Sequence, residues 1–137
     1  MQIGLIAVAL TIGGNMAMAA GCGSSSPDIL KLESFTATRP ENTIVHDATE
    51  ISVELRNLTG RGIRMVDGYV DFSDVLGRDL IRISIEPDED INANIPRYQD
   101  GVYRNQRIIE IHPDDVIAIA CVRAVVFDDG EVVRFTE

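Results

Sequence analysis

Residues 51–56 read Ile51-Ser52-Val53-Glu54-Leu55-Arg56, with an apolar side chain at every second position, and are followed by the polar sequence NLTGRG at 57–62. Alternation with a period of two predicts a β-strand with one buried face. The same pattern recurs at residues 66–73 and 81–86, on either side of Asp74-Val75-Leu76-Gly77. Two such runs separated by a glycine-containing turn predict a hairpin. These segments favour an all-β fold.

Weaker signals on both sides predict further strands at residues 32–38 and 103–111. Pro113-Asp114-Asp115 predicts one helical turn before residues 116–120, with Asp114 as its cap. The C-terminal residues 122–135 predict a second hairpin.

The turn of this C-terminal hairpin contains Asp129-Gly130. An Asp-Gly pair favours a two-residue type I′ loop. With that loop, Val126 would face Val133 and Ala124 would face Phe135.

About seven short strands at these intervals are typical of an antiparallel β-sandwich. We therefore expect one domain over residues 31–137, and a chain of this length buries enough apolar surface to fold without a metal or a disulfide. The expected core side chains are Ile51, Val53, Leu55, Val70, Phe72, Ile83, Val126 and Phe135.

The charges are confined to residues 28–137. The net charge is -10, and no Asp, Glu, Lys or Arg precedes Asp28. Binding to nucleic acid or to anionic lipid headgroups requires clustered Lys and Arg. The composition therefore argues against a nucleic-acid partner and against electrostatic membrane docking.

Residues 3–20 are apolar apart from Thr11 and Asn15 and end in small residues. The segment is marginal for a spanning helix, which needs about 20 predominantly apolar residues. It is typical of a cleavable signal helix, which we assign to residues 1–21.

The sequence Ala19-Ala20-Gly21-Cys22 resembles the lipobox of bacterial lipoproteins. That resemblance implies cleavage before Cys22, diacylglycerol on its sulfur, and a place in the cell envelope, on the outer membrane of a Gram-negative cell because Gly23 follows. The chain differs from the family in having Ala19 in place of the usual Leu and no Lys or Arg before the apolar segment. An ordinary secretory signal is the alternative.

Residues 22–30 contain Gly23-Ser24-Ser25-Ser26, a composition that favours a flexible linker. On this interpretation Cys121 has no partner within the chain and serves as a small apolar strand residue. A disulfide between Cys22 and Cys121 is the alternative in an oxidising compartment, and the expected flexibility around Cys22 argues against it.

Three segments also resemble the FxLYD-type, immunoglobulin-like domains of bacterial surface lipoproteins: Val53-Glu54-Leu55-Arg56-Asn57, Gly68-Tyr69-Val70-Asp71-Phe72 and Asp74-Val75-Leu76-Gly77. The resemblance extends loosely over residues 50–135. It implies an immunoglobulin-like sandwich that serves as an accessory or binding module without catalysis.

Residues 86–101 form the longest segment without a strand pattern. Long loops in compact domains are often functional, and interface cores are enriched in Tyr and Arg. Arg97, Tyr98 and Tyr103 are therefore candidate contacts to another envelope protein. Partial burial of the two tyrosines is an equally good interpretation.

The same segment carries Asp88, Asp90 and Asn92 at the first three ligand positions of a calcium loop. The match then ends, because Ala93 replaces the required glycine and Gln99 replaces the bidentate glutamate. A looser calcium or small-ligand site is one hypothesis for function, and a solvated acidic loop is the other interpretation. No pattern in the sequence indicates a cofactor.

A hydrolase is a further hypothesis. It would require His46 or His112 to lie beside Ser73 or Ser84 in an enclosed pocket. The function expected from the sequence is a lipid-anchored envelope module that binds another protein and has no catalytic activity.

Overall fold

We analysed a computed structural model of the chain, which describes residues 21–40, 47–104 and 106–135. The expected signal helix therefore lies almost wholly outside the described residues. The elements in chain order are β1 (Leu30–Thr38), β2 (Ala48–Asn57), β3 (Ile63–Asp74), β4 (Asp79–Ser84), β5 (Arg97–Arg104), the 3-10 turns η2 (Ile108–Glu110) and η3 (Pro113–Asp115), β6 (Val116–Phe127) and β7 (Val132–Arg134).

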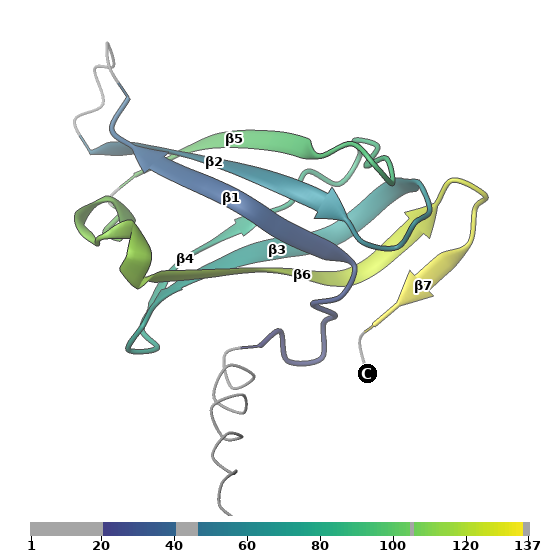
Figure 1. Cartoon of the computed structure of the whole chain (residues 1–137), viewed down its shortest axis with the longest axis horizontal. Helices are drawn as coiled ribbons and strands as arrows, with labels where there is room; N and C mark the ends of the chain where they lie inside the picture. The colour runs from purple at the N-terminus through teal and green to yellow at the C-terminus, as the bar shows by residue number, and fades with distance from the viewer. Residues whose placement is uncertain (1–20, 41–46, 105, 136–137) are drawn as a thin grey trace, which may run out of the picture.

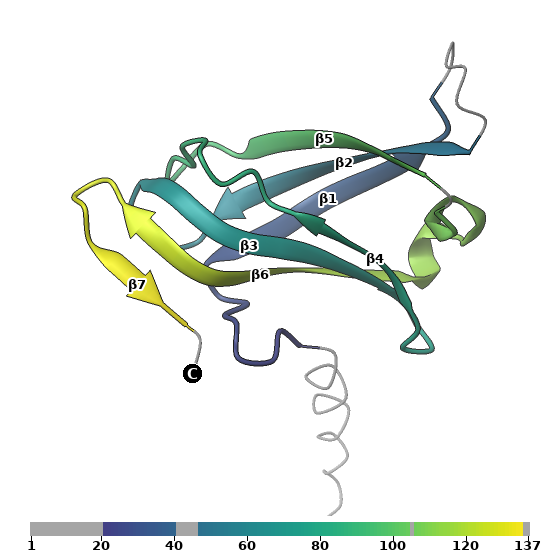
Figure 2. The same ribbon diagram turned by 180° about the vertical axis from the view of Figure 1, so that it is seen from behind.

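The seven strands form two antiparallel sheets that pack face to face (Figure 1). One sheet has the order β1-β2-β5, and the other has the order β4-β3-β6-β7. Figure 2 shows the second sheet from its outer side, with β4 and β7 at its two edges. The predicted all-β fold in two antiparallel layers is confirmed. In the part of the chain described, no helix is long and apolar enough to cross a bilayer.

The core lies between the sheets and uses alternate positions of the central strands, as a half-buried strand requires. Phe35 from β1 and Phe72 from β3 meet edge to face, with ring centroids 5.2 Å apart. Each buried side chain of this kind contributes about 1.5–3 kcal/mol. The predicted core residues that are buried are Ile51, Val53, Leu55, Val70, Phe72 and Ile83.

The C-terminal hairpin differs from its prediction by one residue. Its loop contains Asp128, Asp129 and Gly130, and Gly130 adopts the left-handed conformation with φ 93°. Such three-residue loops end on a glycine in this conformation. Val125 consequently pairs with Val133, where Val126 was expected.

This shift changes which side chains of the hairpin enter the core. Val125 and Phe127 are buried, whereas Val126 and Phe135, which we expected in the core, are only half-buried.

The predicted strand at 103–111 is wrong. Strand β5 ends at Arg104, and residues 108–110 form the 3-10 turn η2, in which Ile108 is buried. The helical turn predicted at 113–115 is present as η3. Its cap is His112, whose Nδ1 accepts the Asp114 N–H, and not Asp114 as expected.

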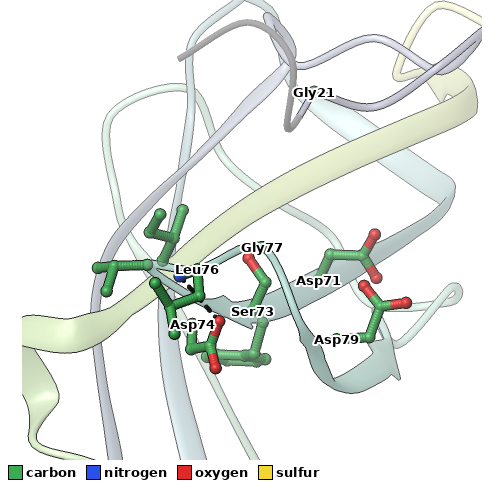
Figure 3. A pocket seen from close by; sticks show the side chains of 10 residues that line it. Gly21, Asp71, Ser73, Asp74, Leu76, Gly77 and Asp79 are labelled. Carbon is green, nitrogen blue, oxygen red and sulfur yellow. Dashed lines mark hydrogen bonds between the residues drawn. The ribbon is translucent and has the colours of Figure 1, made fainter. Parts of the chain in front are cut away.

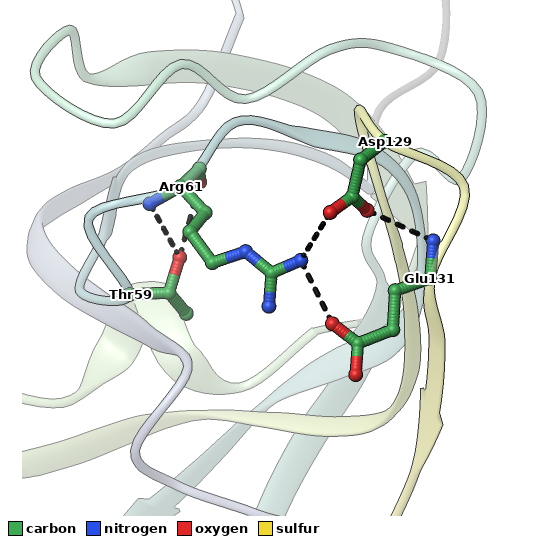
Figure 4. A network of polar contacts seen from close by, with 4 residues as sticks. All are labelled: Thr59, Arg61, Asp129 and Glu131. Atoms are coloured by element: carbon green, nitrogen blue, oxygen red, sulfur yellow. Dashed lines mark hydrogen bonds and ion pairs between the residues drawn. The ribbon is translucent and has the colours of Figure 1, made fainter.

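An exposed ionic cluster holds the turn after β2 against the C-terminal hairpin (Figure 4). The Arg61 guanidinium contacts Asp129 at 2.9 Å and Glu131 at 2.8 Å, and its Cζ lies 3.8 Å from the centre of the Phe127 ring. The pKa of Arg61 is raised, chiefly by its hydrogen bond to Glu131. These contacts join the loop between β2 and β3 to the loop between β6 and β7.

Candidate functional site

The N-terminal segment, residues 21–29, is part of the domain surface. Ser26 and Val122 form an antiparallel bridge in which each backbone N–H donates to the other residue's carbonyl, at 2.8 and 2.9 Å. Ile29 is buried in the main core. The expected flexible linker over residues 22–30 is therefore wrong, because backbone pairing to β6 fixes a segment whose composition alone favours flexibility.

A disulfide joins Cys22 to Cys121 on β6, with their Cα atoms 5.5 Å apart. Cys121 is fully buried beneath the N-terminal segment. The expectation that Cys121 has no partner within the chain is thus contradicted. No cysteine is free among the described residues.

Tyr69 on β3 completes the small apolar cluster under the N-terminal segment. Its hydroxyl donates to the Cys22 carbonyl at 3.4 Å. The guanidinium groups of Arg82 and Arg123 lie 3.9 and 4.5 Å from its ring centroid. Stacked cations interact favourably with an aromatic face, so Tyr69 is held in place to receive Cys22.

The two arginines that contact Tyr69 are themselves paired with carboxylates. Arg82 donates to Asp71 at 2.6 and 2.8 Å, and Arg123 donates to Asp67 at 3.1 Å. The hydrogen bond to Asp71 raises the pKa of Arg82. The outer face of this sheet therefore carries alternating charges around one buried tyrosine.

A second candidate site is the loop that joins β4 to β5. Its interior is occupied by Arg97, whose side chain is 8% exposed. The guanidinium donates to the carbonyls of Glu89 at 3.0 Å and Glu86 at 3.1 Å, and to Gln99 Oε1 at 3.0 Å. Burial lowers the pKa of Arg97. Arg97 thus fixes the loop from within and does not offer a contact to a partner, contrary to our expectation.

Gln99 links β5 to the other sheet at this end of the sandwich. Its Oε1 accepts the Glu86 N–H at 2.8 Å, and its Nε2 donates to the Ser84 carbonyl at 2.8 Å. Farther along the loop, Ile91 is buried and exchanges two backbone hydrogen bonds with Ile63. The loop is therefore attached to both sheets.

The two tyrosines of β5 point in opposite directions. Tyr98 is 68% exposed, and its hydroxyl lies 3.3 Å from Glu54 Oε2. Repulsion between the two negative charges raises the pKa of Tyr98. Tyr103 packs against the core, and burial raises its pKa. Tyr98 thus remains a candidate contact, and Tyr103 is a structural residue.

Strand β5 is also an edge strand, since it pairs only with β2. Val102, on the same face as Tyr98, is 61% exposed. Ile95, just before the strand, is exposed as well. The β5 edge, residues 98–104, combines unpaired backbone groups with two exposed large side chains.

The candidate calcium ligands Asp88, Asp90 and Asn92 are all exposed. The nearby carbonyls of Glu86 and Glu89 accept hydrogen bonds from the Arg97 cation, so they face a positive charge already present. No group of three or more His, Cys, Asp and Glu side chains suited to a metal ion occurs among the described residues.

His112 is exposed, and its Nδ1 accepts the backbone N–H of Asp114, which leaves only Nε2 for any other contact. His46 lies outside the described residues. His112, the candidate hydrolase histidine that the structure describes, therefore serves as the cap of η3.

No protein-family model matches this chain. No curated protein matches it either. One solved structure, the Northeast Structural Genomics Consortium target SoR45, matches with a TM-score of 0.42 and 11% sequence identity, over 79% of this chain and 82% of that one.

Proposed function

We propose that this chain is a binding module of the cell envelope, attached to a membrane at its N-terminus, that recognises another envelope protein through the β5 edge without catalysis. The proposal combines an apolar N-terminal segment, a rigid sandwich and one edge strand with exposed aromatic and aliphatic side chains.

The strand order supports an immunoglobulin-like type of sandwich. In that fold, strands A, B and E share one sheet, and strands C, F and G share the other, to which variable-type domains add C′ beside C. The orders β1-β2-β5 and β4-β3-β6-β7 correspond to A-B-E and C′-C-F-G. Domains of this type commonly act by binding.

The disulfide supports export, because disulfides persist mainly in oxidising compartments. A lipid on Cys22 would use the same sulfur atom, so one molecule carries either the thioether or the disulfide. In the lipid-anchored form that we propose from the lipobox, Cys121 is left as a free thiol. For the disulfide-linked form we propose that the apolar residues 3–20 are retained and make the attachment.

The observation that carries the proposed binding role is the β5 edge. An unpaired edge strand is a template for pairing with a strand of another protein. Natural proteins often protect such edges with charged residues or Pro. The outward positions here include the charged residues Asp100 and Arg104, but they also present Tyr98 and Val102, at 68% and 61% exposure. Arg97 and Gln99 fix the start of the strand and thereby present the edge in one conformation.

Site-specific photo-crosslinking in native membranes tests this role. A photoreactive amino acid at position 98 or 102 is expected to give the same discrete crosslinked species. Position 132 is the matched control, because Val132 is 52% exposed but lies on β7 at the far edge of the other sheet. Equal crosslinking at 132, or none at 98 and 102 in folded protein, would contradict the proposal.

A further inference from the structure

A surface cavity of about 490 Å³ lies where the N-terminal segment meets the turn between β3 and β4 (Figure 3). It is lined by Gly21 on one side and by Val75, Leu76 and Gly77 of the turn on the other, with Ile117 from β6. Polar residues of β3 and β4 complete the lining: Asp71, Ser73, Asp74 and Asp79. Figures 1 and 2 agree that the turn and the N-terminal segment project from the same side of the sandwich. The chain therefore enters the domain beside this turn.

The turn presents a rigid apolar tip. Val75 is 54% exposed, Leu76 is 75% exposed, and the neighbouring Ile117 is 42% exposed. These three residues, which we call the apolar tip, contribute large hydrophobic side chains to one end of the molecule. Clustered exposed apolar residues mark an interaction site more often than single ones do.

Asp74 holds the tip in one conformation. Its carboxylate accepts the backbone N–H groups of Leu76 and Arg78, each at 2.9 Å, and the Arg78 Nε at 2.6 Å. The Val75 N–H donates to the Asp115 carbonyl at 3.0 Å. Because polar groups of the turn are bonded inward, the side chains of Val75 and Leu76 are left facing solvent.

The charges beside the tip are largely paired. Asp74 pairs with Arg78, and Asp71 pairs with Arg82. Asp79, which also lines the cavity, interacts electrostatically with the same Arg82. The tip therefore presents apolar side chains among ion pairs, with no cluster of unpaired cations that would require an anionic surface.

The position of Cys22 fixes where a membrane must lie. Residues 3–20, immediately before Gly21, contain no charged residue. The Ser26–Val122 hydrogen bonds and the burial of Ile29 do not use the Cys22 sulfur, so in either form this segment provides no spacer between the attachment point and the sandwich. A bilayer that holds either the apolar segment or a lipid on Cys22 is thus adjacent to the cavity lined by Gly21.

We propose that Val75, Leu76 and Ile117 contact the lipid bilayer and, together with the N-terminal attachment, fix the orientation of the sandwich. This inference rests on the proposed membrane attachment. In this orientation the β5 edge, which lies in the opposite sheet, faces away from the bilayer. Insertion of a few apolar side chains at the interface adds to the attachment in proportion to the area buried.

The chain contains no tryptophan, so a single introduced tryptophan reports its own environment. The full-length chain with Leu76→Trp is reconstituted into phosphatidylcholine vesicles with and without brominated acyl chains, which quench tryptophan on contact. Ile117→Trp is the second probe, and Tyr98→Trp, at an exposed position of β5, is the matched control. Flotation of the vesicles measures attachment independently.

The expected result is that every variant floats with the vesicles, that Leu76→Trp and Ile117→Trp lose most of their fluorescence in brominated lipid, and that Tyr98→Trp loses little. The orientation is overturned if the variants float but positions 76 and 117 are not quenched, or if position 98 is quenched equally. The membrane attachment is still supported in that case, because the variants float. If neither the unmodified chain nor any variant floats with the vesicles, both the membrane attachment and the proposed orientation are overturned.

Discussion

Ser26 and Val122 exchange two backbone hydrogen bonds, of 2.8 and 2.9 Å, on the same edge of β6 that receives β7 farther along. The residues after Cys22 therefore belong to the sheet, and the disulfide to Cys121 secures an element that is already paired. This relationship makes residues 22–29 and the sandwich one unit.

The disulfide is expected to stabilise the oxidised chain. It closes a loop with a sequence separation of 99 residues, and removal of a native disulfide from a small domain typically costs about 2–5 kcal/mol. Cys121→Ala should lower the free energy of unfolding in urea by that amount relative to the oxidised wild type. Cys22→Ala and the double variant should match it, and an unchanged unfolding midpoint in all three would refute the pairing.

Thiol labelling separates the two forms of Cys22. A chain with the disulfide takes up no alkylating reagent when unfolded without reductant, and two equivalents after reduction. A chain with lipid on Cys22 takes up one equivalent, on Cys121, under either condition. Intact mass of the membrane-extracted protein measures both the label and the acyl chains. A chain with two reactive thiols before reduction would exclude both forms.

Arg97 is expected to be essential for the loop between β4 and β5. Arg97→Ala leaves the Glu86 and Glu89 carbonyls without their donor and opens space near the core, which should cost about 2–4 kcal/mol in urea unfolding. Tyr98→Ala, one residue away but exposed, is the control and should change stability by less than about 1 kcal/mol. Equal effects of the two substitutions would show that Arg97 does not organise the loop.

Asp74 should make the apolar tip sensitive to acid. The backbone N–H of Arg78, followed by its side chain, lowers the pKa of Asp74 below the ordinary 3.8. A carboxylate with a lower pKa in the folded state stabilises the fold above its unfolded pKa, and this contribution is lost as pH falls through the folded value. Asp74→Asn, which cannot ionise, should show a smaller loss of stability over that acid range, measured by urea unfolding. Identical pH profiles for the two proteins would contradict the assignment.

The central strands were predictable because their buried faces are uninterrupted. Ile51, Val53 and Leu55 alternate with polar residues, and the inward positions of β3 are Val66, Gly68, Val70 and Phe72. Most of strand β5 was not predicted, because its inward face is not a continuous apolar one. Its inward positions are occupied by Arg97, Gln99 and Gly101, so its alternation carries no hydrophobic signal. The hydrogen bonds of Arg97 and its ion pair with Glu89 explain how a buried arginine is tolerated there.

The composition of residues 21–29 also could not predict that this segment pairs with β6. The bridge at Ser26 uses backbone atoms alone, and any residue except proline can supply them. One residue of β3 could have indicated that a segment covers the outer face of this sheet. It is Tyr69, which occupies the outward position between Gly68 and Val70. A large aromatic residue on an outward face, opposite Cys121 in the register, indicates that something covers it.

The disulfide also determines how tension passes through the oxidised molecule. Ser26 and Phe135 bond to the adjacent residues Val122 and Arg123 of β6, so both described ends of the chain converge on one strand. A pull between Cys22 and the C-terminal end travels through the sulfur atoms and then along residues 121–135 only. Strands β1 to β5, including the β5 edge, lie outside that path. After reduction, the same pull would first shear the two hydrogen bonds at Ser26 and then draw on β1.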